Sequence, residues 1–464
     1  MRTILVAAVL GGLCVWMCAA PVEAAQMRAG VARVEITPPE KGTPLSGYAA
    51  RTSGSIGVLD PLYAKALVLD CDGKRMALVS LDIISLPSER IPKEAEQRFG
   101  VGLVLLVASH THFGPNFRSK RWPEPDGGEK TFRLTEDRVI EAIEKASQNM
   151  FPARLSLARG EITLGYHRLK MQPDGRRRPL FQNPDHLPYG PVDPTVSLIR
   201  VENTDDETTR ALLVGYACHP VCLASRCLFI SADYPGAMMA KVEAALRQPK
   251  AATKEVGNER PKARKRSVQS TENLKQEDPK PPALCMFVQG GAGSVNPYFI
   301  EEKTGQPGAT TLHKHMGELL ADEVLLAVRK SQPLAGPSEI QWRKKTLTFA
   351  HRWSTTATVP VEMATVLINR TIGIAAVPGE TFLSLQTMFK RDAPVEFPLF
   401  AGYTTCGGAE WPSYIPDIRA AAEGGYGADY TTHIEVGAAE RIANQAVIDL
   451  FDMKGMFHDK PGGK

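Results

Sequence analysis

Short apolar segments with strand character alternate along this chain with longer segments of helical periodicity, and this alternation most constrains the fold. The strand-like segments either alternate apolar and polar residues or are short, continuous and rich in β-branched residues. Because strands and helices are intermixed, we expect an α/β fold: a mixed β-sheet core flanked by helices in a single large domain, residues 26–455. The predicted strands cover residues 31–37, 62–69, 75–81, 103–108, 196–201, 211–217, 284–288, 365–368, 372–377 and 399–404, and the predicted helices cover 135–150, 234–247, 312–329, 382–391 and 436–453.

The first 25 residues have the pattern of a secretory signal peptide. Arg2 precedes an apolar run over residues 4–20, and small residues end the segment at Ala24 and Ala25. An uncleaved membrane anchor is the alternative, but an apolar run of 17 residues that contains two glycines is marginal for crossing a bilayer. We therefore expect cleavage after Ala24 or Ala25, and a secreted or periplasmic protein with no later transmembrane helix.

The positive net charge lies in one polar segment and does not indicate a nucleic-acid partner. Residues 250–282 contain nine Lys or Arg and five Asp or Glu, and this difference equals the whole formal net charge of +4. The segment has few apolar residues to bury, so we expect a disordered basic insert over residues 249–283. A solvated loop is favoured over a loop that contacts anionic surfaces. Residues 456–464 are expected to form a C-terminal tail.

Six cysteines follow the predicted signal peptide, too few for a disulfide-based scaffold in a chain of this length. An oxidising compartment would permit a bridge such as Cys222–Cys227, but spacing alone assigns no pairing. The six are Cys71, Cys218, Cys222, Cys227, Cys285 and Cys406.

Three apolar strands each end near a residue that can bind a metal or transfer a proton. His110 and His112 follow the strand at 103–108, and in an extended chain residues two apart face the same side. Both imidazoles could bind one metal, or one could bind it while the other transfers a proton. His219, which alone could equally be a core histidine, follows a second strand. Glu380 follows a third, where a carboxylate could also favour the start of a helix. Together, two His and one Glu predict a zinc site with an open position for water.

A glycine-rich loop, residues 289–297, follows the predicted strand at 284–288. Its glycines allow the backbone to approach a ligand closely. The loop lacks the Gly-Lys-Ser/Thr ending of a P-loop. Ser294 is followed by Val295 and Asn296, so the loop also differs from the Gly-x-Ser-x-Gly elbow. We therefore expect this loop to shape a site without presenting a recognised nucleophile motif.

Seven segments in collinear order resemble the neutral/alkaline (non-lysosomal) ceramidase family. The resemblance extends from about residue 29 towards the C-terminus and includes the strand-end motifs. The segments are Ala-Gly-Val-Ala-Arg-Val-Glu-Ile-Thr-Pro (29–38), Asp-Pro-Leu-Tyr-Ala-Lys-Ala (60–66), Ala-Ser-His-Thr-His-Phe-Gly-Pro (108–115), Cys-His-Pro (218–220), Ser-Ala-Asp-Tyr-Pro-Gly (231–236), Phe-Val-Gln (287–289) and Pro-Gly-Glu (378–380).

Members of this family are zinc amidases, so the resemblance implies one Zn²⁺ per chain and particular roles for the matching residues. His112 matches the second His of the His-Thr-His motif, near the scissile bond, and Arg168 and Tyr426 match further site residues. The resemblance also implies a role in lipid metabolism, specifically sphingolipid metabolism. The implied zinc ligands are His110, His219, Glu380 and Tyr414.

The chain departs from the family pattern at three places. The family's Gly-Asp-Val-Ser-Pro loop is Gly-Ser-Val-Asn-Pro here, which puts Asn296 in the place of a serine and Ser294 in the place of an aspartate. An asparagine cannot form an acyl-enzyme. Ser413 precedes Tyr414 where the family has a glycine. No counterpart of the family's C-terminal immunoglobulin-like domain follows before Lys464.

We therefore expect a secreted zinc-dependent hydrolase of a linear amide bond, whose substrate is an N-acyl lipid or a related small N-acyl compound. Zinc-activated water would attack the carbonyl, and His112 would pass a proton to the leaving amine. Arg168, Tyr426 or Asn296 would stabilise the oxyanion. One alternative is a zinc hydrolase of an ester or a non-lipid N-acyl group. The other is a non-catalytic descendant that binds a metal or ligand. Peripheral contact of the protein with a membrane is compatible with this expectation.

Overall fold

The computed structural model describes residues 26–247, 282–301 and 311–457 of the chain. The predicted signal peptide at 1–25, the predicted basic insert as far as residue 281 and residues 458–464 of the predicted tail lie outside the described residues. Within the described part, no helix combines the length and apolar character needed to cross a membrane.

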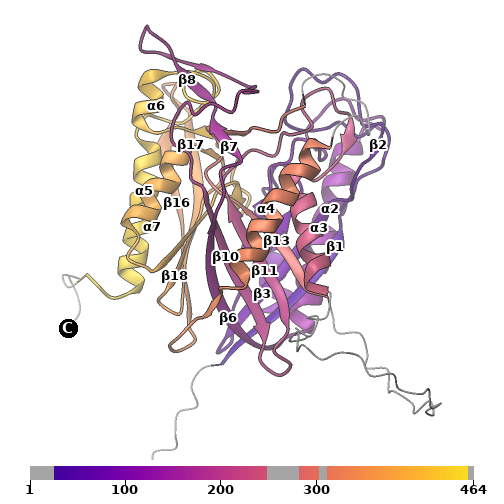
Figure 1. Ribbon diagram of the computed structural model, residues 1–464, viewed down its shortest axis with the longest axis vertical. Coiled ribbons are helices and arrows are strands. Elements are labelled where there is room, and N and C mark those ends of the chain that lie inside the picture. Colours follow the sequence, from indigo (N-terminus) through magenta and orange to yellow (C-terminus); the bar gives the residue numbers. More distant parts are fainter. Residues whose placement is uncertain (1–25, 248–281, 302–310, 458–464) are drawn as a thin grey trace, which may run out of the picture.

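A mixed ten-stranded sheet forms the larger half of the molecule (Figure 1). Two neighbouring pairs, β4–β5 and β11–β13, are parallel, and the other pairs are antiparallel. In sheet order the strands are β13 (Leu284–Gln289), β11 (Thr209–Tyr216), β10 (Thr195–Asn203), β6 (Phe151–Glu161), β1 (Met27–Glu35), β3 (Tyr63–Cys71), β4 (Lys74–Leu81), β5 (Val101–Ala108) and β21 (Thr404–Thr405), with β15 (Gln332–Pro333) paired to β6.

A second sheet of four strands packs on one face of the first. Its strands are, in order, β16 (Ile340–Ala350), β17 (Thr358–Ile368), β18 (Ile372–Ala376) and β20 (Phe397–Ala401). Leu67, Leu105 and Leu213 of the large sheet share one buried cluster with Val366 and Ile374 of the small sheet. The small sheet therefore covers one face of the large sheet, and helices cover the other. Burial of both faces explains why strands such as β5 are almost continuously apolar.

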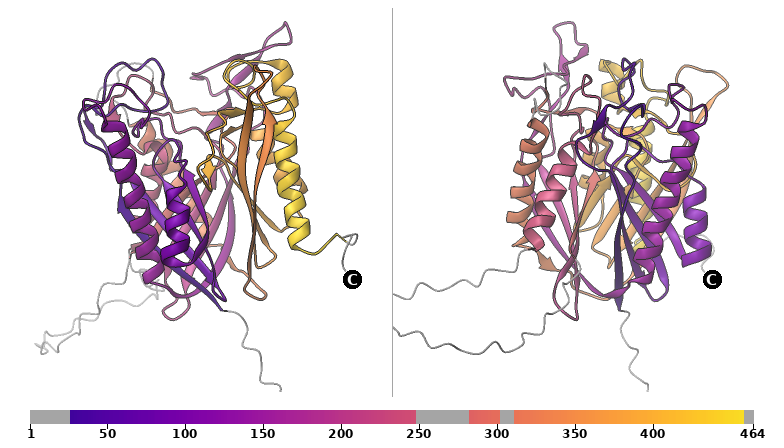
Figure 2. Two further views of the ribbon diagram at one scale, coloured as in Figure 1. Left: turned by 180° about the vertical axis from the view of Figure 1, so that it is seen from behind. Right: turned by 90° about the vertical axis from the view of Figure 1, so that its right-hand side faces the viewer.

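Helices cover the outer faces of both sheets, so the molecule has four layers: helices, sheet, sheet, helices (Figures 1 and 2). The larger sheet is covered by α1 (Arg90–Phe99), α2 (Gly127–Gln148), α3 (Asp233–Arg247) and α4 (Leu312–Val328). The smaller sheet is covered by α5 (Leu383–Asp392) and α7 (Ala438–Met453). The remaining helix, α6 (Ile418–Glu423), is short.

Four short two-stranded ladders lie among the connecting loops, and two of them position the candidate site. One pairs β14 (Val295–Pro297) with β7 (Gly165–His167), and another pairs β19 (Glu380–Thr381) with β22 (Tyr414–Ile415). The other two pair β2 (Gly57–Val58) with β12 (Phe229–Ile230), and β8 (Leu169–Met171) with β9 (Arg177–Pro179).

The expected α/β fold with a mixed sheet and flanking helices is confirmed, and each predicted strand or helix overlaps an observed element of the same type. The division into two sheets was not predicted. Among the longer elements, strands β6 and β16 and helix α1 were missed, and the short ladders and helix α6 were not predicted. Strand β16 contains Arg343, Lys344 and Lys345 and lies at the edge of the small sheet, where charged side chains reach solvent. The six cysteines of the described region are all buried and unpaired.

Candidate metal centre

The candidate site lies where the ends of the two sheets meet. His110 follows β5 and His219 follows β11, so both imidazoles come from the large sheet. Glu380 follows β18 of the small sheet and begins β19, where it pairs in register with Tyr414 of β22. The three strand ends that the sequence singled out are therefore brought to one place.

Backbone carbonyls hold two of the imidazoles in a defined orientation. His110 Nδ1 lies 3.0 Å from the Ile84 carbonyl oxygen, and His219 Nδ1 lies 2.6 Å from that of Ala292. A carbonyl only accepts hydrogen bonds, so each Nδ1 carries a proton, and in a neutral ring Nε2 is then the atom with a lone pair. Such a second partner on the far ring nitrogen is typical of metal-binding histidines.

The two Nε2 atoms converge on one carboxylate oxygen. Glu380 Oε2 lies 3.3 Å from His110 Nε2 and 3.2 Å from His219 Nε2. Although it is that close to the carboxylate, the buried His110 Nε2 has no hydrogen-bond partner among the described residues. His219 Nε2 is within hydrogen-bond distance of the same oxygen, and a cation placed between the three atoms would bind two imidazole nitrogens and one carboxylate oxygen. The arrangement therefore fits a bound cation.

The electrostatic environment keeps His219 and Glu380 in the deprotonated state that metal binding requires. Burial, with Arg168 as the next cause, lowers the pKa of His219 to about 4. Burial alone would raise the pKa of Glu380, but His110 and His219 outweigh it and hold this pKa well below its usual range. At neutral pH the site therefore contains a neutral His219 and a carboxylate.

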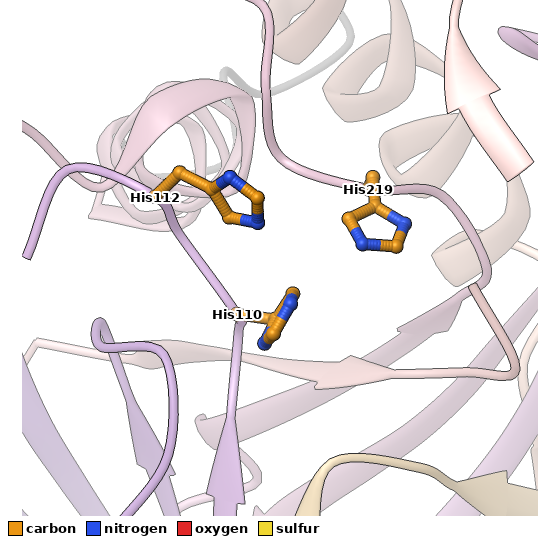
Figure 3. A group of neighbouring side chains, drawn as sticks. All are labelled: His110, His112 and His219. Atoms are coloured by element: carbon orange, nitrogen blue, oxygen red, sulfur yellow. The ribbon is translucent and has the colours of Figure 1, made fainter. Parts of the chain in front are cut away.

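His112 lies beside this pair and has no polar partner of its own. His110, His112 and His219 are buried, and their ligand atoms lie within 4.8 Å of one another (Figure 3). Both ring nitrogens of His112 are without a hydrogen bond in the described part of the chain. Burial, followed by the two neighbouring imidazoles, lowers its pKa well below the usual value. The three histidines form a second possible metal-binding group, alongside the set of two histidines and Glu380.

The segment that carries His110 and His112 is not extended, which corrects the geometric argument from sequence. His110 has φ 67°, in the left-handed region, and lies beyond the end of β5. The rings of His110 and His112 nevertheless lie 5.1 Å apart. A turn, and not the pleat of a strand, thus brings them together. Left-handed backbone at a non-glycine residue is strained and is often found at functional sites.

Arg168 joins the other predicted site residues into one buried cluster. Its Nη2 donates to the Tyr414 hydroxyl at 3.0 Å, and its Nη1 donates to Asn296 Oδ1 at 3.3 Å. The guanidinium also lies 5.2 Å from the centre of the Tyr426 ring. Ser413, which precedes Tyr414, has φ 61°, a conformation that favours glycine and matches the glycine of the family pattern.

Ser294 makes contacts that are structural. Its Oγ accepts a hydrogen bond from the Leu383 N–H at 3.3 Å, at the first residue of α5, where N–H groups lack partners within the helix. Its carbonyl accepts one from the Arg168 N–H at 2.9 Å. The side chain of Ser294 therefore stabilises the start of α5 and makes no hydrogen bond to the three imidazoles.

Sequence reasoning missed two aromatic residues at the site. The Tyr403 ring lies 4.3 Å from that of His110, and its buried hydroxyl has no partner among the described residues. The Trp411 ring is nearly parallel to that of His110, with centres 6.5 Å apart. Tyr403 lies within the predicted strand at 399–404, so the rule of searching strand ends could have found it. Trp411 lies in a loop that offers no such signal.

The fold and the buried cluster define an α/β protein with a candidate metal centre made of histidine and carboxylate. Comparison with known proteins identifies the family: the model for neutral/alkaline non-lysosomal ceramidase, N-terminal, matches residues 27–311, more than half of the chain. The chain belongs to this family, which confirms the resemblance found in the sequence.

Individual relatives agree with this assignment. The neutral ceramidase of Mycobacterium tuberculosis (strain ATCC 25618 / H37Rv) is 24% identical over 205 residues, which cover 41% of this chain and 31% of that protein. The crystal structure of the neutral ceramidase from Pseudomonas aeruginosa superposes with a TM-score of 0.68 at 14% identity, covering 95% of this chain and 76% of that one. A second structure, a ceramidase complexed with C2, gives a TM-score of 0.69 at 14% identity, covering 95% and 77%. These structures share the fold over nearly the whole chain.

Proposed function

We propose that this protein is a zinc-dependent hydrolase of a linear amide bond in an N-acyl lipid or a related N-acyl compound. Family membership supports an amide hydrolase of the ceramidase type. The observation that carries the metal is the convergence of His110 Nε2 and His219 Nε2 on Glu380 Oε2. The residues at 1–25 support secretion or a periplasmic location, with peripheral contact to a lipid surface where the substrate is a lipid.

The residues present fit a zinc ion. Zinc binds imidazole nitrogen and carboxylate oxygen, and catalytic sites leave one position open for water. His110, His219 and Glu380 would hold the ion, with the Tyr414 hydroxyl as a further ligand beside Glu380. When bound, zinc supplies Lewis-acid activation of water and of the substrate carbonyl. Burial raises the pKa of Tyr414 well above its usual value, so without a metal its hydroxyl stays protonated.

The remaining residues of the cluster would transfer protons and stabilise the negative charge of the oxyanion. The neutral His112 ring, with two unpartnered nitrogens, is placed to accept a proton and pass it to the leaving amine. Arg168 provides a fixed positive charge for the oxyanion. Asn296 Oδ1 already accepts a hydrogen bond from Arg168, so the amide NH₂ of Asn296 is the end left to donate. Tyr426 packs beside Arg168 and helps to hold it.

Two other functions are kept as candidates, each on a specific observation. The three-histidine group provides a metal-binding set in which His112 is itself a ligand. A zinc ion held by either set would also activate water towards an ester or a non-lipid N-acyl group. Asn296, in the place of the family's serine, favours a non-catalytic protein that retains the metal.

Metal analysis combined with a substrate panel tests the proposal. We expect one zinc per purified chain, and turnover of N-acyl amides that exceeds turnover of matched acyl esters. Preferred hydrolysis of the esters would favour the ester candidate. Zinc without turnover of any member of the panel would favour the non-catalytic one. A chain that takes up no zinc from a stoichiometric solution would refute the metal centre.

A further inference from the structure

A cavity of about 380 Å³ adjoins the candidate metal centre. Gly47 and Tyr48 line it and also contact the His112 ring. The Tyr48 ring lies 4.8 Å from the His112 ring, and a Cβ atom on Gly47 would lie 2.1 Å from His112 Cγ. Arg51 and Arg121 also line the cavity, and none of its lining residues in the described chain is acidic. This volume lies within the range of small-ligand sites.

Arg51 brings a buried positive charge to this cavity without a negative partner. The residue is only 7% exposed. Its guanidinium donates only to neutral carbonyl oxygens, those of Ser46 at 2.7 Å, Ser225 and Cys227 at 3.1 Å, and His112. Burial lowers the pKa of Arg51 to about 10, so it remains charged at neutral pH. The rings of Tyr48 and Phe113, 4.6 and 4.9 Å from its Cζ, also stabilise this charge, and an anion in the cavity would add the missing negative partner.

Arg121 places a second positive charge at the mouth of the same cavity. It is exposed, and its Nη1 donates to the carbonyl oxygen of Arg51. Neither arginine forms an ion pair with an acidic residue of the described chain. Lys120, the preceding residue, is also exposed but does not line the cavity. Arginine is well suited to bind carboxylate, sulfonate or phosphate through paired hydrogen bonds.

We propose that this cavity binds an anionic group carried by the amine part of the substrate, so that the preferred substrates are N-acyl amines with a carboxylate, sulfonate or phosphate on that part. The inference rests on the proposed amide hydrolysis. His112, the proposed proton donor to the leaving amine, lies between the metal centre and the cavity. The amine part of a bound amide therefore points towards Arg51 and Arg121, and the acyl chain points away from them.

Two N-acyl compounds of equal size test this inference. N-octanoylglycine carries a carboxylate on its amine part, and N-octanoylglycinamide is its neutral counterpart. We expect the wild type to prefer the first by at least tenfold in kcat/KM. Arg121→Gln should lower kcat/KM for N-octanoylglycine about tenfold more than for the glycinamide. The matched control Lys120→Gln, which removes an equal charge outside the cavity, should leave both values unchanged.

Other results would overturn the inference. Equal losses of kcat/KM for the two compounds in Arg121→Gln would show that the cavity does not recognise the anionic group. Equal effects of Lys120→Gln and Arg121→Gln would show the same. Inorganic phosphate that stabilises the protein in an Arg121-dependent manner, without any preference between the two compounds, would show a site for a free anion only.

Calorimetric titration separates this inference from the proposed function. If the wild type hydrolyses neither compound, the two compounds are titrated into the wild type and both variants. Tighter binding of N-octanoylglycine that is weakened by Arg121→Gln and not by Lys120→Gln supports the anion site, even though the hydrolase proposal then fails. Binding without preference for the carboxylate overturns the inference.

Discussion

The two sheets contribute different kinds of group to the candidate centre, and they hold them in different ways. The large sheet contributes His110 and His219, and backbone carbonyls orient both rings. Glu380 follows β18 of the small sheet and pairs with Tyr414 in the short β19–β22 ladder, and Arg168 donates a hydrogen bond to the Tyr414 hydroxyl. The imidazole half is therefore oriented within one sheet, whereas the complete site exists only when the two sheets are packed together.

The same division determines which residues of the candidate site each comparison with known proteins covers. The family model ends at residue 311 and so contains the imidazole half only. Glu380 and Tyr414 lie beyond it, in the part that the structural superpositions with known ceramidases cover. Experiments that separate the two halves are thus the most informative.

The largest effect is expected from removing a ligand on either side. His110→Ala, His219→Ala and Glu380→Ala should each reduce bound zinc well below one per chain and lower activity by roughly a thousandfold or more, because an incomplete ligand set leaves the ion weakly held. His112→Ala should keep the zinc and lose activity. Elemental analysis measures the zinc, and the exposed His315→Ala is the control. Zinc at one per chain in Glu380→Ala, with loss of zinc in His112→Ala, would establish the three-histidine alternative.

The next largest effect is expected at Arg168, which connects the two halves. It contacts Tyr414, the ladder partner of Glu380, and Asn296 of β14. Arg168→Lys keeps the charge but lacks the planar fork whose two nitrogens contact Asn296 and Tyr414. We expect kcat/KM to fall about a hundredfold with zinc content unchanged. Steady-state kinetics alongside elemental analysis would show this, and activity within twofold of the wild type would mean that the paired hydrogen bonds are unnecessary.

Asn296 and Ser294 distinguish direct attack by water from a serine mechanism. Asn296→Ala should lower kcat roughly a hundredfold, the usual cost of removing one oxyanion donor. Ser294→Ala should retain activity within about tenfold, because the Ser294 hydroxyl is occupied at the start of α5. The Ser294→Ala variant should mainly lose stability, by about 1 kcal/mol. Labelling of wild-type Ser294 by a fluorophosphonate probe would instead support an acyl-enzyme.

A further effect, on stability and not on activity, concerns the large sheet alone. Burial raises the pKa of Asp82 from 3.8 to about 7, and this outweighs the nearby Lys65 and the hydrogen bond from the Tyr63 N–H at 2.9 Å, which both lower it. A folded-state pKa above the unfolded value contributes stability at low pH, and this contribution is lost as the pH rises towards 7. Asp82→Asn should therefore gain about 2 kcal/mol relative to the wild type between pH 5 and pH 7. Urea unfolding at the two pH values measures this gain, and a pH-independent difference would contradict it.

Local patterns in the sequence predicted those site residues whose position depends on a single strand. His110, His219 and Glu380 were found because each follows an apolar run, and a strand end is recognisable without knowing its neighbours. Tyr414 and Arg168 were found only through the family resemblance. Their relation to the site depends on the β19–β22 ladder and on packing across the two sheets.

What the sequence could not predict was set by tertiary structure. Residue patterns show that a strand has an apolar face but not which strand or sheet covers it, so the second sheet was not separated from the first. The left-handed conformation of His110 and the stacking of Trp411 on its ring likewise arise from packing between segments distant in the chain. The cavity at Arg51 and Arg121 combines two loops 70 residues apart and had no local signal.

Anomalous diffraction at the zinc absorption edge, from crystals of the zinc-loaded wild type, tests the central claim most directly. If the ion joins the two sheets, a single peak will lie about 2.0–2.2 Å from His110 Nε2, His219 Nε2 and a Glu380 carboxylate oxygen. A peak coordinated by His110, His112 and His219, with Glu380 outside bonding distance, would place the metal within the large sheet alone and contradict the account.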